Sequence, residues 1–354
     1  MPNPSATNDA AHPIEGLRAA SAIPEALAQK LAAEHYGLPA TVHRLNSERD
    51  QNFRLTTLDG REYVLKIANP AEDSAVTNLQ TEALLHLAVT DPGLPIPRVF
   101  PTMNGAHELA IQFDDGSTRI VRLLSYMAGI PMHAVEGSKM LRHDLGRCAA
   151  RLAKGLRNFR HAGASHKLLW DLQHAAELRS LVDAVPADRR GLVEDCLDGF
   201  EARALPLLRG LDEQPVHNDL NPHNIVVDPA NNERISGIID FGDLAFTARV
   251  NDLAIAAAYQ VADSDDPLAP PCDLVAAYHA VTPLDAAEFD ILFDLMATRM
   301  VMTVVISSWR ARRYPENRDY ILRNNSPAWA RLSRVTRLSR VQATRQIQRA
   351  CRSE

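Results

Sequence analysis

The sequence predicts an α+β protein with two domains: a small antiparallel sheet with one helix, followed by a larger and mainly helical domain. Strand-like runs near the N-terminus span residues 40–45, 52–58 and 62–68. Asp59-Gly60, between the last two runs, is a strong two-residue hairpin signal. Apolar residues with helical spacing follow later, at 141–159, 175–208 and 286–312, and Pro186 is expected to break the second of these segments. A chain of 354 residues is long enough for two such domains.

The predicted boundaries follow from changes in composition along the chain. Residues 1–13 are polar and rich in small side chains, which is typical of a disordered leader. The first domain is expected at 14–124 and the second at 125–354. A hinge is expected near 123–129, where the residue pattern changes from that of a strand to that of a turn. Within the first domain a helix is expected from Pro24 to Tyr36, and Gly37 is a natural stop.

Composition excludes several classes of function. Hydrophobic residues make up 46% and charged residues 23% of the chain, as in ordinary globular proteins. The net charge of −6 gives no footprint for nucleic acid, and no apolar run approaches the length of a membrane span. The four cysteines are scattered without a C-x-x-C pair, which favours reduced thiols in a cytoplasmic protein. The sequence leaves a homodimer open.

The most informative stretch runs from His217 to Asp243. It begins His217-Asn218-Asp219-Leu220-Asn221-Pro222-His223-Asn224, continues as a β-branched run with a polar turn, and ends Ile239-Asp240-Phe241-Gly242-Asp243. The two apolar runs predict a hairpin, which would bring Asn224 at its start close to Asp240 at its end. Asp219 lies on the loop just before it.

These three side chains suit phosphoryl transfer. That reaction requires a group to orient the acceptor hydroxyl, for which Asp219 is the candidate, and ligands for Mg²⁺, for which Asn224 and Asp240 are the candidates. The order H-x-D-x-x-x-x-N followed by D-F-G is also that of the catalytic and metal loops of protein kinases. The competing interpretation, a loop rich in Asn and Asp that caps a hairpin, leaves both carboxylate positions unexplained.

Two charged residues of the first domain fit the same chemistry. Lys66 is a lone cation in an apolar strand, and Glu82 lies in the middle of a predicted helix at 73–89. In a kinase-like small lobe, a strand lysine holds the phosphates and pairs with a helix glutamate. Taken singly, each residue is more often a solvated surface side chain.

The sequence resembles the aminoglycoside phosphotransferase-like small-molecule kinases, which share the protein-kinase fold. The resemblance spans about residues 23–320 and rests on the two loops quoted above, on Val250-Asn251-Asp252-Leu253-Ala254, and on Leu45-Asn46-Ser47-Glu48-Arg49-Asp50-Gln51-Asn52-Phe53. Within that family it most resembles the hydroxylysine kinases. Asn218 is a departure, because glycine is common there. The resemblance implies a bilobal protein-kinase-like fold.

The resemblance also implies roles for single residues. Asp219 would be the catalytic base, Asn224 and Asp240 would hold magnesium, and Lys66 with Glu82 would position the phosphates. Nucleotide contacts would come from the loop bordered by Ser47 and Asn52 and from the hinge at Tyr126 and Met127. His217 and Asp252 would support the loops structurally. For an amino-acid acceptor, Asp243 and Arg299 are candidates to meet its ammonium and its carboxylate.

We therefore expect a Mg²⁺-dependent kinase that uses ATP or GTP to phosphorylate a hydroxyl of a small amino compound, with 5-hydroxylysine favoured. Homoserine, an amino alcohol and an aminoglycoside are alternative acceptors. A non-catalytic nucleotide-binding scaffold is the alternative from another class, and the intact Asp219, Asn224 and Asp240 count against it. A basic amphipathic helix predicted at 329–351 is expected to pack on the second domain.

Overall fold

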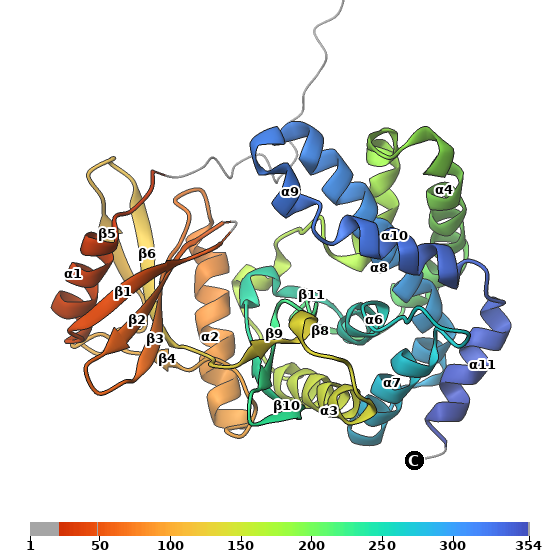
Figure 1. Ribbon diagram of the computed structural model, residues 1–354, viewed down its shortest axis with the longest axis horizontal. Helices are drawn as coiled ribbons and strands as arrows, with labels where there is room; N and C mark the ends of the chain where they lie inside the picture. The colour runs from red at the N-terminus through yellow and green to blue at the C-terminus, as the bar shows by residue number, and fades with distance from the viewer. Residues whose placement is uncertain (1–20, 48, 353–354) are drawn as a thin grey trace, which may run out of the picture. The chain divides into compact units, whose positions relative to one another are not determined.

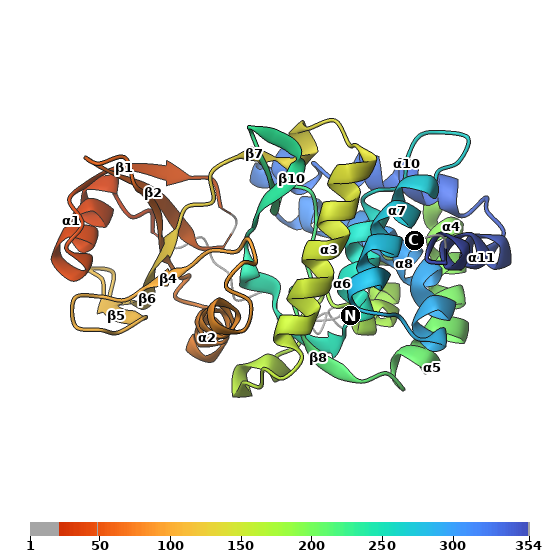
Figure 2. The ribbon, with the colours of Figure 1, turned by 90° about the horizontal axis from the view of Figure 1, so that it is seen from below.

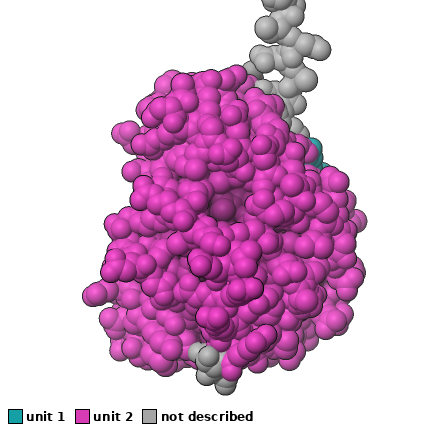
Figure 3. Space-filling model, turned by 90° about the vertical axis from the view of Figure 1, so that its right-hand side faces the viewer, with its two compact units in different colours: residues 1–78, 99–126, 167–169 teal, residues 79–98, 127–166, 170–354 magenta. Residues whose placement is uncertain are grey.

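The computed structural model describes residues 21–47 and 49–352, so the leader expected at residues 1–13 lies outside the described residues. The chain divides into two compact units, whose elements are labelled in Figure 1. Figure 3 colours the units separately and shows mainly the surface of unit 2, in magenta. Unit 1 contains the chain up to residue 78 together with 99–126 and 167–169, and unit 2 contains 79–98, 127–166 and the chain from 170 onward. Antiparallel sheets and many helices confirm the α+β class.

Unit 1 is built on a six-stranded antiparallel sheet with the strand order β1-β2-β3-β6-β4, and β5 pairs with β6. Its strands are β1 (Ala40–Leu45), β2 (Gln51–Thr57), β3 (Glu62–Ile67), β4 (Val99–Phe100), β5 (Leu109–Gln112) and β6 (Thr118–Ser125). The turn at Asp59-Gly60 joins β2 to β3, with Gly60 at φ 81°, which only glycine adopts readily. The sequence therefore predicted this hairpin correctly.

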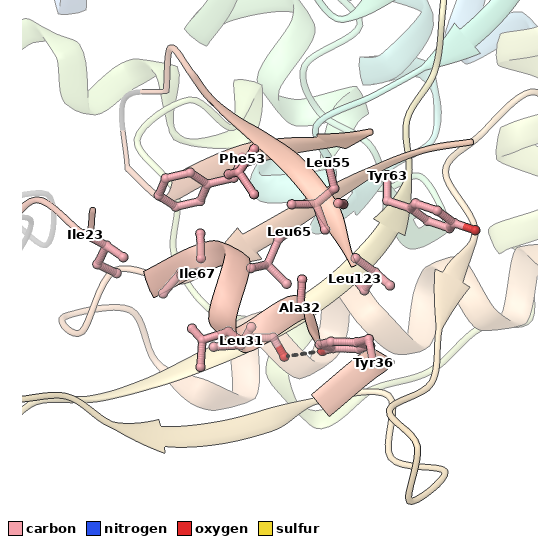
Figure 4. Close-up of a cluster of buried hydrophobic side chains, with 14 residues drawn as sticks. Ile23, Leu31, Ala32, Tyr36, Phe53, Leu55, Tyr63, Leu65, Ile67 and Leu123 are labelled. Carbon is pink, nitrogen blue, oxygen red and sulfur yellow. Dashed lines mark hydrogen bonds between the residues drawn. The ribbon is translucent and has the colours of Figure 1, made fainter. Parts of the chain in front are cut away.

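Helix α1 (Glu25–Tyr36) covers one face of this sheet. Its inward side chains, among them Leu31 and Tyr36, meet Phe53, Leu65 and Leu123 from three neighbouring strands in one buried cluster (Figure 4). The helix ends at Gly37, whose φ of 64° and N–H bond to the Ala33 carbonyl form a left-handed C-cap. Because alternate strand residues fill this core, the side chains between them point to the opposite face.

Helix α2 (Ser74–Thr90) begins in unit 1, but from Leu79 onward the chain belongs to unit 2. Residues 79–98 were expected in the first domain. They pack with unit 2 because Asp91 pairs with Arg151 at 2.6 Å and the Pro95 carbonyl accepts the Ile238 N–H at 2.7 Å.

Unit 2 is mainly helical, with α3 (Lys139–Leu156) lying along α7 (Ala269–Val281) (Figure 2). The remaining helices are α4 (Arg190–Gly199), α5 (Leu205–Leu208), α6 (Val250–Ala258), α8 (Ala286–Arg313), α9 (Arg318–Ile321), α10 (Asn325–Val335) and α11 (Arg340–Ala350). Two small sheets interrupt them: β10-β9-β7 and β11-β8. Their strands are β7 (Ile130–Pro131), β8 (Glu213–Val216), β9 (Ile225–Asp228), β10 (Asn231–Ile238) and β11 (Ala245–Ala248).

The long helix α8 has a defined start. The Asp285 carboxylate accepts the Glu288 N–H, and the Glu288 carboxylate accepts the Asp285 N–H, which together form a capping box. Glu288 is also paired with Arg249 at 2.7 Å. These contacts fix the position of α8, which carries Arg299 in its buried middle.

Pro186 interrupts the helical segment at 175–208, as the sequence predicted, because Val185 is extended before the proline. The part before the break is a 3₁₀ helix from Leu172 to Ala184, and α4 follows the break. The single helix expected at 329–351 is two helices, α10 and α11. They separate at Thr336–Ser339, where the N–H groups of Arg337 and Leu338 bond three residues back and tighten the chain into a turn.

Across residues 21–47 and 49–352, no helix combines the length and the apolar character that crossing a membrane requires.

Candidate active site

The loop after β8 is fixed by one carboxylate from α6. Asp252 is buried, and its two oxygens accept the N–H groups of His217 at 2.9 Å and Asn218 at 2.6 Å. Burial raises the pKa of Asp252, while His217 and these N–H bonds act in the opposite direction. Asn218 has a φ of 63°, a conformation that glycine and asparagine tolerate best. Asn218 therefore keeps the loop geometry although it is not glycine.

Asp219 is held by donors on both carboxylate oxygens. Its Oδ2 accepts the Nδ2 groups of Asn221 at 2.8 Å and Asn224 at 2.7 Å, and its Oδ1 accepts the NH2 group of Arg299 at 2.8 Å. The side chain remains 20% exposed. Burial raises the pKa of Asp219, the Arg299 guanidinium lowers it, and the nearby Asp243 charge raises it. The Asp219 carboxylate is therefore fixed in orientation and still accessible from solvent.

The hairpin brings the two predicted metal ligands to the same end of the small sheet. The Ile239 N–H donates to the Asn224 carbonyl at 2.9 Å, so Asn224 lies beside the residue that precedes Asp240. Asp240 has a φ of 64°, and its carboxylate accepts the Gly242 N–H at 3.4 Å. Asn224 donates to Asp219 through Nδ2, so its side-chain oxygen is the atom that would bind a cation. One carboxylate and one amide oxygen are suitable Mg²⁺ ligands.

His217 joins the two loops. Its Nδ1 accepts the Asp219 N–H at 3.3 Å, so its Nε2 carries the proton and donates to the Ile239 carbonyl at 3.1 Å. The ring also meets Phe241 edge-on, with ring centres 4.8 Å apart. The imidazole is fully buried and both nitrogens are engaged. These contacts give His217 a structural part in the site.

Arg299 reaches the site from the middle of α8. Besides Asp219, it donates through NH1 to the Trp170 carbonyl at 3.2 Å, and its guanidinium lies 5.0 Å from the centre of the Trp170 ring. Burial alone would lower the pKa of Arg299, but Tyr259 and Asp219 raise it above its ordinary value. The structure thus brings Arg299, expected near a substrate, against the predicted catalytic base.

The predicted nucleotide residues of unit 1 lie on the sheet face opposite α1. Asn52, Lys66 and Arg122 are cross-strand neighbours on β2, β3 and β6, so their side chains share that face. Asp50, at the start of β2, lies 3.5 Å from the Lys66 ammonium and 3.9 Å from the Arg122 guanidinium. Its other oxygen accepts the Asn69 N–H at 3.2 Å. Ser47 is exposed on the preceding loop.

Sequence reasoning did not single out Asp50 or Arg122. Both follow from strand register, because Arg122 opposes Lys66 directly and Asp50 precedes the strand that carries Asn52. Glu82, expected to pair with Lys66, is exposed on the part of α2 that belongs to unit 2. A pair of Lys66 with Glu82 stays a prediction.

The predicted hinge contains the point where unit 1 ends, since Tyr126 belongs to unit 1 and Met127 to unit 2. The Tyr126 N–H donates to the Glu62 carbonyl at 3.2 Å, and the Arg54 guanidinium lies 4.3 Å from the centre of its ring. The role of both residues in nucleotide binding stays a prediction.

The loops and their geometry define a small-molecule kinase, and comparison with known proteins identifies its family. The model of the phosphotransferase enzyme family matches residues 41–289, so the chain belongs to that family. This confirms the resemblance inferred from the loop sequences.

Curated relatives are similar over most of the chain. Hydroxylysine kinase of Mus musculus is 30% identical over 333 residues, which cover 88% of this chain and 89% of the relative. Hydroxylysine kinase of Danio rerio is 32% identical over 323 residues, covering 88% of this chain and 90% of the relative.

Solved structures share the fold at lower identity. Amicoumacin kinase hAmiN, in complex with AMP-PNP, Ca²⁺ and Ami, has a TM-score of 0.66 at 18% identity and covers 92% of this chain and 94% of its own. A microcompartment-associated aminopropanol kinase has a TM-score of 0.65 at 18% identity, and the match covers 92% of this chain and 98% of the kinase.

Proposed function

We propose that the protein transfers the γ-phosphoryl group of ATP or GTP to a hydroxyl of a small amino compound, with 5-hydroxylysine as the favoured acceptor. The similarity to hydroxylysine kinases of Mus musculus and Danio rerio over 88% of the chain carries the choice of acceptor. The arrangement around Asp219 supports the type of reaction, because its carboxylate is fixed and still 20% exposed.

In the proposed reaction the acceptor oxygen forms a bond to the γ-phosphorus while the bond from that phosphorus to the bridging oxygen of the nucleoside diphosphate breaks. Asp219 orients the hydroxyl and takes its proton. Lys66, oriented by Asp50, holds nucleotide phosphate, and Ser47 and Asn52 border the nucleotide loop. Asn224 and Asp240 would hold Mg²⁺, which neutralises phosphate charge when it is bound.

A direct assay tests this proposal. Purified protein is incubated with Mg²⁺, ATP or GTP, and one acceptor from a panel of 5-hydroxylysine, homoserine, an amino alcohol and an aminoglycoside. We expect phosphate transfer to 5-hydroxylysine with the highest kcat/KM of the panel. Higher kcat/KM on another member would replace the acceptor. Nucleotide binding without transfer to any of them would favour the non-catalytic scaffold.

A further inference from the structure

Unit 2 contains a small cavity lined by Arg299, the residue that pairs with the predicted catalytic base. It measures about 10 Å³, close to the smallest space that holds one water molecule or one oxygen atom. Tyr259, Arg299 and Arg331 line it, together with residues of α8 and α10. Two of these three side chains are cations, and among the described residues no carboxylate lines the cavity.

Arg299 lines this cavity and also contacts Asp219. Its NH2 group donates to Asp219 and its NH1 group to the Trp170 carbonyl. Its Nε is buried and has no hydrogen-bond partner among the described residues. A buried donor without an acceptor is costly, so this N–H is a natural position for an added acceptor atom.

Arg331, on α10, is the second cation. It lies with its guanidinium 5.9 Å from the centre of the Tyr259 ring. Within residues 21–47 and 49–352 it has no ion-pair partner, whereas Arg334 on the same helix pairs with Asp263. Burial lowers the pKa of Arg331, and the neighbouring Arg334 charge lowers it further, while Tyr259 acts in the opposite direction. A half-buried guanidinium of this kind is better stabilised with an anion beside it.

We propose that Arg331 and the Nε of Arg299 form a subsite for the carboxylate of an amino-acid acceptor, with one carboxylate oxygen in the cavity. The inference rests on the proposed function and narrows it to acceptors that carry a carboxylate. Arg299 contacts Asp219 and also lines the cavity, so a hydroxyl at Asp219 and a carboxylate at Arg331 would both lie next to this one side chain. The short carbon chain of 5-hydroxylysine joins two such groups, and guanidinium groups bind carboxylates through matched pairs of hydrogen bonds.

Arg331→Gln tests the subsite with two acceptors, 5-hydroxylysine and its decarboxylated amine, 1,5-diaminopentan-2-ol. We expect kcat/KM for 5-hydroxylysine to fall roughly 10- to 150-fold, the usual effect of losing a charged hydrogen-bond partner. The decarboxylated amine has no group for Arg331 and should be used as well as by the parent protein. Arg331→Lys keeps the charge and should lose less. Arg334→Gln, on the same helix but paired with Asp263, is the matched control and should change neither acceptor.

A second measurement needs no variant. L-lysine and 1,5-diaminopentane both lack the reacting hydroxyl, and only L-lysine has a carboxylate. We expect L-lysine to inhibit the parent protein at least tenfold more strongly, measured against 5-hydroxylysine. Equal inhibition, or equal losses of Arg331→Gln on both acceptors, overturns the subsite and leaves the kinase assignment intact. Failure of the parent protein to use 5-hydroxylysine overturns the proposed acceptor itself, and the inference with it.

Discussion

At the level of single residues, Asp219 has an environment that fixes the position of its carboxylate. Two amide groups and one guanidinium bond its carboxylate, and each restricts its rotation. A fixed carboxylate aligns the attacking hydroxyl, and alignment supplies much of the rate in phosphoryl transfer. Arg299 also offsets the cost of burying the charge.

The first prediction concerns Asp219→Asn. The substitution keeps the size and removes the charge, so we expect turnover to fall by roughly 100-fold or more. Nucleotide affinity should stay within a few-fold of the parent protein, as measured by isothermal titration. Near-normal turnover on the true acceptor would show that another group orients the hydroxyl.

A second prediction separates Arg299 from Arg331. Because Arg299 holds Asp219, Arg299→Ala should reduce kcat for every acceptor, including the decarboxylated amine, by roughly tenfold or more. It also leaves the Asp219 charge without its cation, which should lower the thermal midpoint. Loss confined to acceptors that carry a carboxylate would instead restrict Arg299 to substrate recognition. Steady-state kinetics on both acceptors distinguishes these outcomes.

At the level of elements, the sheet of unit 1 places a row of polar side chains across three strands. Asn52, Lys66 and Arg122 face the same way because their strands pair directly, and Asp50 lies within ion-pair distance of both cations. The side chains of Lys66 and Asp50 are 12% and 14% exposed, so their attraction is screened less than that of a surface pair. Strand pairing thus brings Lys66, Arg122 and Asp50 together in a cluster with one net positive charge.

The prediction for this element compares Asp50→Asn with Glu82→Gln. Without the Asp50 charge the Lys66 ammonium has more rotamers open to it, so we expect kcat/KM for nucleotide to fall roughly tenfold. Glu82→Gln removes an exposed acid and is expected to have a smaller effect. Unchanged or tighter nucleotide binding in Asp50→Asn would contradict the proposed role, and an equal loss in Glu82→Gln would assign that role to both acids.

Much of this arrangement could be predicted from local patterns. The strands of unit 1 follow from the alternation of apolar and polar residues and from the Asp59-Gly60 turn. The hairpin between Asn224 and Asp240 follows from its β-branched runs. The contact of Arg299 with Asp219 joins residues 80 positions apart, and no local pattern encodes it. The break between α10 and α11 contains neither glycine nor proline, so the turn propensities of its residues did not predict it.

At the level of the whole molecule, burial of the cysteines provides a test of how the chain packs. Burial raises the pKa of Cys148 and of Cys272 to about 12 and that of Cys196 to about 11. A thiol reacts as its thiolate, so these three should be labelled slowly by a disulfide reagent at pH 8 and rapidly after unfolding in denaturant. Rapid labelling of Cys148 in the folded protein would contradict its packing in α3.

Metal binding requires more ligands than the two side chains that the protein contributes. Among the described residues no three His, Cys, Asp or Glu side chains gather as a metal-binding group. Asn224 and Asp240 alone give two oxygen ligands, and Mg²⁺ prefers six ligands with phosphate oxygens among them. Metal and nucleotide are therefore expected to bind together.

Isothermal titration measures this coupling. We expect little heat from Mg²⁺ alone, and clear Mg²⁺ binding once a non-hydrolysable nucleotide is present. The pair should also raise the thermal midpoint more than either component, because stabilisation grows with ligand concentration over Kd and reaches about 2.7 kcal/mol at a hundredfold excess. Asp240→Ala should abolish the coupling while nucleotide alone still binds, since Lys66 and the loop of unit 1 are unchanged. Tight Mg²⁺ binding without nucleotide, retained in Asp240→Ala, would place the metal elsewhere.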